Sequence, residues 1–220
     1  MSDATTPSSR APLAPNDRIA EVLFGLIMVL TFTGSLSVAD SGREDVRAML
    51  IGALGCNIAW GIIDGVLYIM GALAEKGANL KTYLAVRAAP DAKAARGLIA
   101  ESLPEVVAKV LRPEELDAVH ERLVKLPDPP ARAKLDASDW KGAFAVFLWV
   151  FFTTFPVSIP FIFMSHLGPA MRTSNAIAVT MLFIAGFAYG RHVGRSGWLF
   201  GLSMVVLGLA LVAMTMALGG

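Results

Sequence analysis

The chain has 220 residues, a net charge of +1, a hydrophobic share of 55% and a mean hydropathy of +0.59. Because the apolar residues are clustered, this composition indicates an integral membrane protein rather than a soluble domain. The small net charge gives no basic footprint for nucleic acid, and a single cysteine excludes a disulfide framework or a multi-cysteine zinc site.

The N-terminal half begins with a polar segment and two apolar segments. Residues 1–17 are rich in Ser, Thr and Pro, which predicts a disordered tail. An apolar segment follows from about Ile19 to Ala39. It is about twice as long as a signal-peptide core, so we expect an uncleaved transmembrane helix, although Ser37-Val38-Ala39 has cleavage-site spacing. A charged loop at 40–47 then leads to a second helix from about Val46 to Leu73.

The stretch Met49–Met70 is long enough to cross a bilayer yet contains polar residues. Asn57, Gly61, Asp64 and Tyr68 fall at i, i+4, i+7 and i+11, which places them on one helix face. A carboxylate within a spanning helix costs about 2.5–3.5 kcal/mol on insertion scales and is a functional candidate by default. The alternative is a protonated, hydrogen-bonded Asp64 that holds helices together.

Residues 75–141 hold most of the charges, of both signs, and predict a soluble helical insert. We expect Tyr83–Arg87 to extend the preceding helix, and new helices to start at Pro90-Asp91, Pro104-Glu105 and Pro113-Glu114. The third would bury a stripe on one face, formed by Leu116, Val119, Leu123 and Leu126.

Acidic residues in the insert recur at helical spacing. They form two groups, Glu101 with Glu105, and Glu114, Asp117 and Glu121 with His120 beside them. Carboxylates and an imidazole at this spacing are able to gather a divalent cation. The pattern favours a solvated face with i,i+4 salt bridges instead, because Lys109, Arg112, Arg122 and Lys125 are interleaved.

Three further apolar segments follow the insert. The first, Gly142 to about Met164, carries Pro156 and Pro160, which free backbone carbonyls and break helical regularity. The next runs from about Ala176 to Tyr189, with an extension back to Thr173, and the last covers Trp198 to Leu218.

The sequence thus predicts an all-α integral membrane protein with five transmembrane helices and a cytoplasmic helical insert between helices 2 and 3. Its parts are the tail, helices 1–2 at 18–74, the insert at 75–141 and helices 3–5 at 142–220. More Lys and Arg lie in the tail, insert and 191–195 turn than on the opposite side, which has only Arg43, Arg47 and Arg172. The positive-inside rule therefore places the N-terminus and insert in the cytoplasm and the C-terminus outside.

This layout resembles the vacuolar iron transporter family, over about residues 18–218. Phe24-Gly25-Leu26 is similar to the start of that family's first-helix motif, and Pro156-Val-Ser-Ile-Pro160 to its proline-rich third span. The last two spans, joined by a basic turn with Gly190-Arg191, match the family's ending in pattern. The resemblance implies a divergent bacterial-type member in the inner membrane, and a homodimer with its path between subunits.

The chain departs from the family pattern at two places. Ile27-Met28 stands where the family has an Asn-Asp pair, and Asp64, Gly65 and Tyr68 stand near its Gly-Glu-Tyr on the second helix. The insert is also poorer in glutamate than the family's metal-binding insert.

These patterns favour a transporter of divalent transition metal ions, Fe²⁺ or Mn²⁺, that exchanges them for protons. Asp64 would be the intramembrane carboxylate, Asn57 and Tyr68 polar ligands, and Glu21 a residue at the cytoplasmic mouth. Met28 would offer a thioether, although core filling is the better explanation of a methionine in a chain that has ten of them. The partners are then the bilayer and the metal ion, with no cofactor and no enzymatic activity. The alternative is a non-transporting protein of the same fold whose insert docks a partner.

Overall fold

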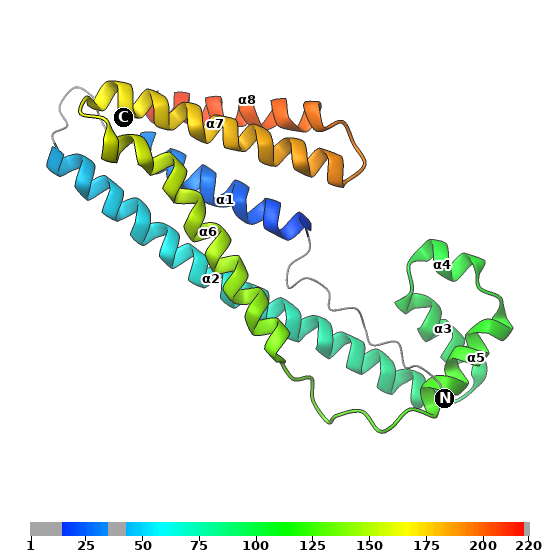
Figure 1. Ribbon diagram of the computed structural model, residues 1–220. Helices are drawn as coiled ribbons and strands as arrows, with labels where there is room; N and C mark the ends of the chain where they lie inside the picture. The colour runs from blue at the N-terminus through cyan, green and yellow to red at the C-terminus, as the bar shows by residue number, and fades with distance from the viewer. Residues whose placement is uncertain (1–14, 35–42, 218–220) are drawn as a thin grey trace, which may run out of the picture. The chain divides into compact units, whose positions relative to one another are not determined.

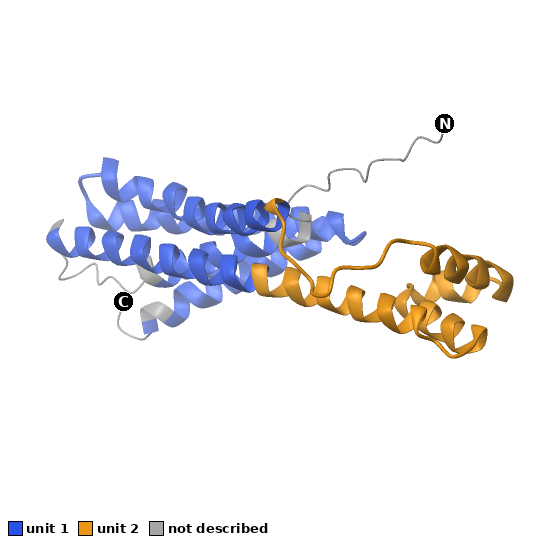
Figure 2. Cartoon of the chain, turned by 90° about the horizontal axis from the view of Figure 1, so that it is seen from below, with its two compact units in different colours: residues 1–68, 138–220 blue, residues 69–137 orange. Residues whose placement is uncertain are grey.

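The computed structural model describes residues 15–34 and 43–217, and every regular element among them is a helix (Figure 1). The helices are α1 (Pro15–Gly34), α2 (Arg43–Arg87), α3 (Ala92–Ser102), α4 (Glu105–Val110), α5 (Pro113–Val124), α6 (Ala137–Phe163), α7 (Leu167–His192) and α8 (Gly197–Ala217). The chain divides into two compact units, Met1–Tyr68 with Ser138–Gly220, and Ile69–Ala137 (Figure 2).

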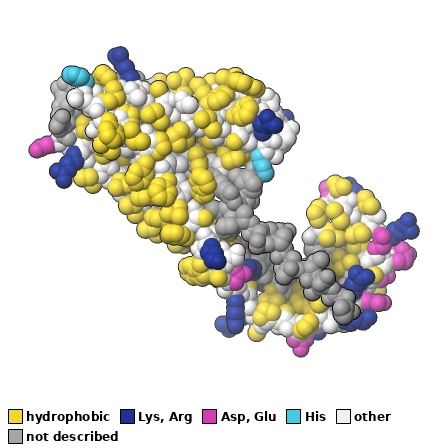
Figure 3. Space-filling view, in the orientation of Figure 1, with side chains coloured by type: hydrophobic (Ala, Val, Ile, Leu, Met, Phe, Trp, Pro, Cys, Tyr) yellow, Lys and Arg dark blue, Asp and Glu magenta, His cyan; other side chains and the backbone are white. Residues whose placement is uncertain are grey.

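Four helices are long and apolar enough to cross a membrane, namely α2, α6, α7 and α8. In α1 the apolar stretch that the structure describes is shorter, Ile19–Thr31. Hydrophobic side chains spread over the surface of the long helices (Figure 3), and Ile51, Phe144 and Leu199 are each more than 60% exposed. Exposed apolar surface of this extent is what contact with lipid requires. The all-helical membrane class is confirmed, and the count of five spans stays a prediction.

The second helix is longer at both ends than its hydropathy predicts. α2 begins at Arg43, so part of the loop expected at 40–47 is helical, and Glu44 and Asp45 suit its first turn because carboxylates favour the positive end of the helix dipole. The expected extension through Arg87 is confirmed. The chain has no proline between residues 16 and 89, and α2 stops just before Pro90.

The two prolines do not interrupt α6, which runs unbroken to Phe163. Hydroxyl groups bond to carbonyls along the same stretch. Thr153 donates to the carbonyl of Val150 at 2.6 Å, and Ser158 donates to the carbonyl of Thr154 at 2.9 Å. A proline lacks only its own N–H, so Pro156 and Pro160 remove the amide donors to the carbonyls of Phe152 and Pro156 while the rest of the helical hydrogen-bond pattern is kept.

The helices α7 and α8 form a closely packed hairpin. Its turn contains Gly194 with φ +71°, a left-handed conformation that suits glycine. A Cβ at Gly186 would lie 2.7 Å from the carbonyl oxygen of Phe200, and one at Gly201 would lie 2.7 Å from the ring of Phe183. Glycines here let the two backbones approach, as small residues do between membrane helices.

The core of the first unit is built around α1. Leu26 and Leu30 are fully buried and pack with Ala53 of α2, Val157 of α6 and Leu182 of α7. The shortest apolar helix therefore lies at the centre of the unit, in contact with all four of the longer ones, since Met204 and Val212 of α8 also pack against this cluster.

The second unit has a small core of its own. Val86 of α2, Ile99 of α3 and Leu116 of α5 form its buried cluster. The expected helix start at Pro90-Asp91 is confirmed, since Asp91 caps α3 and accepts a hydrogen bond from the amide of Ala94 at 2.7 Å.

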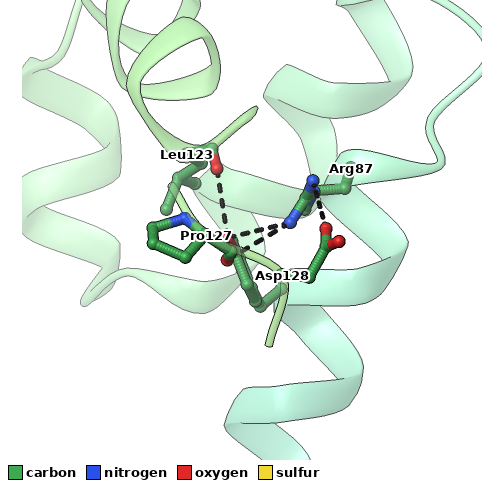
Figure 4. Close-up of polar contacts among 5 residues, drawn as sticks. Arg87, Leu123, Pro127 and Asp128 are labelled. Atoms are coloured by element: carbon green, nitrogen blue, oxygen red, sulfur yellow. Dashed lines mark hydrogen bonds and ion pairs between the residues drawn. The ribbon is translucent and has the colours of Figure 1, made fainter. Parts of the chain in front are cut away.

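The end of α5 is tied to α2 by polar contacts (Figure 4). Arg87 forms an ion pair with Asp128 at 3.0 Å and donates to the carbonyl of Pro127. The hydroxyl of Tyr83 donates to the carbonyl of Leu123 at 3.2 Å. These bonds fix the segment that leaves α5 against the last turns of α2.

The buried stripe expected on α5 is correct only in part. Leu116 is buried and Leu123 packs on the cluster, whereas Val119 and Leu126 are 38% and 51% exposed. The core that α2, α3 and α5 form here is too small to cover both ends of the stripe. The valines of α4 are also exposed, with Val106 and Val110 each at 76%.

Candidate functional site

Two carboxyl groups from different helices meet in the first unit. Phe24 of α1 and Trp60 of α2 stack edge to face, with ring centroids 5.2 Å apart. One turn along each helix, a side-chain hydrogen bond joins Glu21 and Asp64. A hydrogen bond between two carboxyl groups requires a proton on one of them, because two carboxylates only accept. This geometry lets the two carboxyl groups share one proton between them.

Asp64 has further capacity to bind. Its Oδ2 atom is buried, and no residue in the described part of the chain provides it with a hydrogen-bond partner. An oxygen left in this state is costly in a low-dielectric setting and tends to mark a site that takes up a proton, an ion or water.

Asn57 lies on the same face of α2, but its amide nitrogen is bonded to α6. Its side chain is 1% exposed, and its amide donates to the hydroxyl of Thr154 and, at 3.4 Å, to the carbonyl of Val150. The structure thus places Asn57 in the packing of α2 against α6.

If Asp64 had a purely structural role, hydroxyl groups of α6 would be expected to donate hydrogen bonds to its carboxyl group. Those hydroxyl groups bond to other atoms instead. Thr153 donates to Val150, Thr154 accepts from Asn57, and Ser158 donates to the carbonyl of Thr154. The partner that the structure gives Asp64 is instead an acid.

The remaining candidates of the membrane part lie on the same two helices. Tyr68 is half-buried and covers Gly142 so closely that a Cβ there would overlap its ring. Met28 is half-buried on the face of α1 that also carries Gly25, where a Cβ would overlap the hydroxyl of Thr153 of α6. Glu21, Met28, Asp64 and Tyr68 thus all lie within the first unit.

The acidic residues of the insert lie mostly at its surface. Glu101, Glu114 and Glu121 are exposed, and His120 is half-buried. Two of the acids are already paired. Glu105 bonds to Lys109 at 2.5 Å, which is an i,i+4 salt bridge, and Asp117 contacts Arg96 at 3.6 Å.

Within residues 15–34 and 43–217, no three His, Cys, Asp or Glu side chains are grouped so that they could hold a metal ion. In the first unit, Glu21 and Asp64 bring two carboxyl groups together where a cation could bind. Two carboxylates supply part of a coordination shell, and water or further ligands must supply the rest.

Sequence reasoning missed the packing that brings this pair together. Gly61 lies against Phe147 of α6, with an ideal Cβ 3.2 Å from its carbonyl oxygen, and Gly65 lies equally close to the carbonyl of Ala143. The spacing Gly61-x-x-x-Gly65, a known signal for close helix contact, was available in the sequence.

Comparison with known proteins gives a family match over about the last two thirds of the chain. A search of curated proteins found no match. A sequence model of the VIT family matches residues 72–220, which include the insert and α6–α8. The candidates Glu21, Met28, Asn57, Asp64 and Tyr68 all precede the matched region, in the part where the first-helix motif departs from the family pattern. The match covers more than half of the chain, and together with the apolar helices it establishes that this protein belongs to the VIT family of membrane metal-ion transporters.

Proposed function

We propose that the protein carries divalent transition metal ions, Fe²⁺ or Mn²⁺, across a bacterial inner membrane in exchange for protons. The observation that supports this most directly is the hydrogen bond between Glu21 and Asp64. A cation that binds both carboxylates must displace the proton they share, so metal and proton compete for the same oxygens. This competition is the minimum that exchange transport needs.

Glu21 would supply the carboxylate that the first-helix motif lacks. Met28 occupies the position of the family's aspartate, and Glu21 lies seven residues earlier, on the same face of α1. The ligand set would then consist of two hard carboxylates with the Met28 thioether nearby on that face. Tyr68 would lie one turn beyond Asp64 on α2 as a polar group of the path.

The proposal includes the arrangement of the chain in the membrane. α1 would be the fifth span, because it lies at the centre of the unit formed by the other spanning helices. The excess of Lys and Arg in the N-terminal segment, the insert and the 191–195 turn supports a cytoplasmic position for these parts. A homodimer would complete the metal's coordination with groups from a second copy.

The test is metal uptake into proteoliposomes under a pH gradient. The parent should take up Fe²⁺ or Mn²⁺, and internal pH should change in step with uptake. Asp64→Asn and Glu21→Gln keep the size of each side chain and remove its charge, so each should reduce flux at least tenfold. Flux that persists in both variants would refute the assignment of the pair as the exchange site.

A second function is favoured by the exposed valines of α4, Val106, Val107 and Val110. A soluble insert with such a face would suit docking of a protein partner, in a chain that does not transport. The same uptake experiment separates the two functions. Well-folded parent protein that moves none of several divalent ions would favour the docking function.

A further inference from the structure

A cavity of about 890 Å³ lies at the end of the first unit where α2 begins and α6 meets α7. This volume is within the roughly 300–1,000 Å³ of small-molecule sites. Neither Glu21 nor Asp64 lines it, so it is separate from the carboxyl pair. Its inner wall is packed, since Met49, Phe161 and Ala170 belong to one buried cluster there.

The cavity is apolar along its length and basic at its end. From α2, Arg47, Ile51 and Leu54 line it at i, i+4 and i+7, so they form one stripe with the cation outermost. His166 lines it from the turn before α7, and its side chain makes no capping hydrogen bond to that helix. Among the described residues, no Asp or Glu lines the cavity.

The position of the cavity identifies the occupant that fits it. Arg47 lies in the second turn of α2 and His166 directly before α7, so both lie at the ends of spanning helices, where lipid headgroups are found. The apolar stripe continues into surface that faces hydrocarbon, as Ile51 and Ile162 are 61% and 67% exposed. A ligand here would have an anionic head and a long apolar chain.

We propose that this cavity binds one anionic phospholipid from the surrounding bilayer. The guanidinium of Arg47 and the imidazole of His166 donate hydrogen bonds to the phosphate, and an acyl chain lies along Ile51 and Leu54. Arginine suits this role because its planar group donates two parallel bonds to phosphate oxygens. The proposal does not depend on metal transport.

The experiment uses the full chain, purified in detergent and stripped of lipid. Native mass spectrometry counts bound lipid, and thermal unfolding measures stabilisation, each with added dioleoylphosphatidylglycerol or dioleoylphosphatidylcholine. We expect one phosphatidylglycerol per chain, bound at least tenfold more tightly than phosphatidylcholine, with a matching rise in Tm. Arg47→Gln should weaken this binding roughly tenfold, and His166→Gln should weaken it less.

The matched control is Arg172→Gln, which removes an exposed arginine of α7 that does not line the cavity. It should bind phosphatidylglycerol as the parent does. Ile51→Trp, which fills the apolar part without changing charge, should also reduce lipid binding.

Three outcomes would overturn the proposal. One is equal binding of the two lipids, and another is an equal loss in Arg172→Gln and Arg47→Gln. The third is full stabilisation by inorganic phosphate alone, which would make the site one for a free anion. The proposal is supported if Arg47→Gln loses lipid while its size-exclusion elution volume and its Tm without lipid stay unchanged. Misfolding would alter both of these quantities.

Discussion

Asn57 and Asp64 lie seven positions apart on α2, and their side chains bond to different neighbouring helices. Asn57 is buried with its amide bonded to α6, whereas Asp64 meets Glu21 of α1 and keeps one oxygen without a partner in the described structure. A buried group bonded to a neighbouring helix contributes to stability, while a carboxyl group with spare hydrogen-bonding capacity is suited to function. The two residues should therefore separate stability from transport.

Substitution of Asn57 by alanine should destabilise the fold and spare transport. Loss of the amide removes two interhelical hydrogen bonds, and interhelical bonds in membranes contribute about 0.6–2 kcal/mol. We expect a lower Tm in detergent, with uptake per folded molecule close to that of the parent. Asp64→Asn is the matched variant and should show the reverse, a near-parent Tm with flux lost. If Asn57→Ala abolished flux at an unchanged Tm, Asn57 would belong to the transport path rather than to packing.

At the level of elements, contact between α2 and α6 positions Asp64. Gly61 and Gly65 allow α6 to approach within van der Waals distance of the α2 backbone, and Tyr68 continues this contact by covering Gly142. Asp64 lies between the two glycines in sequence and projects toward α1, where Phe24 and Trp60 set the register. A shift of α2 by one turn would separate the two carboxyl groups, so the tight packing of α2 against α6 also maintains the pair.

Glycine substitutions on α2 should test this packing. A Cβ at Gly61 would lie 2.9 Å from the ring of Phe147 and 3.2 Å from its carbonyl oxygen, so Gly61→Val must push the helices apart. Overpacking of this kind costs about 1–3 kcal/mol, and we expect a lower Tm together with reduced uptake.

The control is Gly55→Val on the same helix, since a Cβ at Gly55 would meet nothing within 4 Å. It should leave both the Tm and uptake close to the parent's values. Equal losses in the two variants would show that helix propensity, rather than contact with α6, explains the effect.

For the whole molecule, composition and periodicity predicted the membrane class and the positions of the apolar helices, because runs of apolar residues must face lipid or a core. Hydropathy alone did not predict where α2 ends, since it falls after Leu73, whereas the helical extension expected over Tyr83–Arg87 was confirmed. Composition and periodicity placed Glu21 and Asp64 on helix faces, but their contact depends on the register between α1 and α2. That register depends on how side chains of different helices pack together, so it cannot be predicted from any one segment alone.

The division into two units allows the insert to be tested by removal. The Nζ atom of Lys76 lies 2.8 Å from Oδ2 of Asp136, so the two ends of the second unit are close together. Residues 78–134 can therefore be replaced by a short Gly-Ser linker with little change in the distance between the ends. If the acids of the insert collect ions, the apparent KM for metal uptake should rise severalfold, with maximal flux largely retained.

Charge neutralisation within the intact insert provides the control for that deletion. Glu114→Gln with Glu121→Gln removes two exposed carboxylates of α5 that make no ion pair within 4.0 Å in the described structure, and it should raise the apparent KM in the same direction. Glu105→Gln, which removes an acid already paired with Lys109, should have a smaller effect. An uptake curve that is identical for the parent, the deletion and the α5 variant would exclude ion collection, and the exposed valines of α4 would then be the feature of the insert that still requires a function.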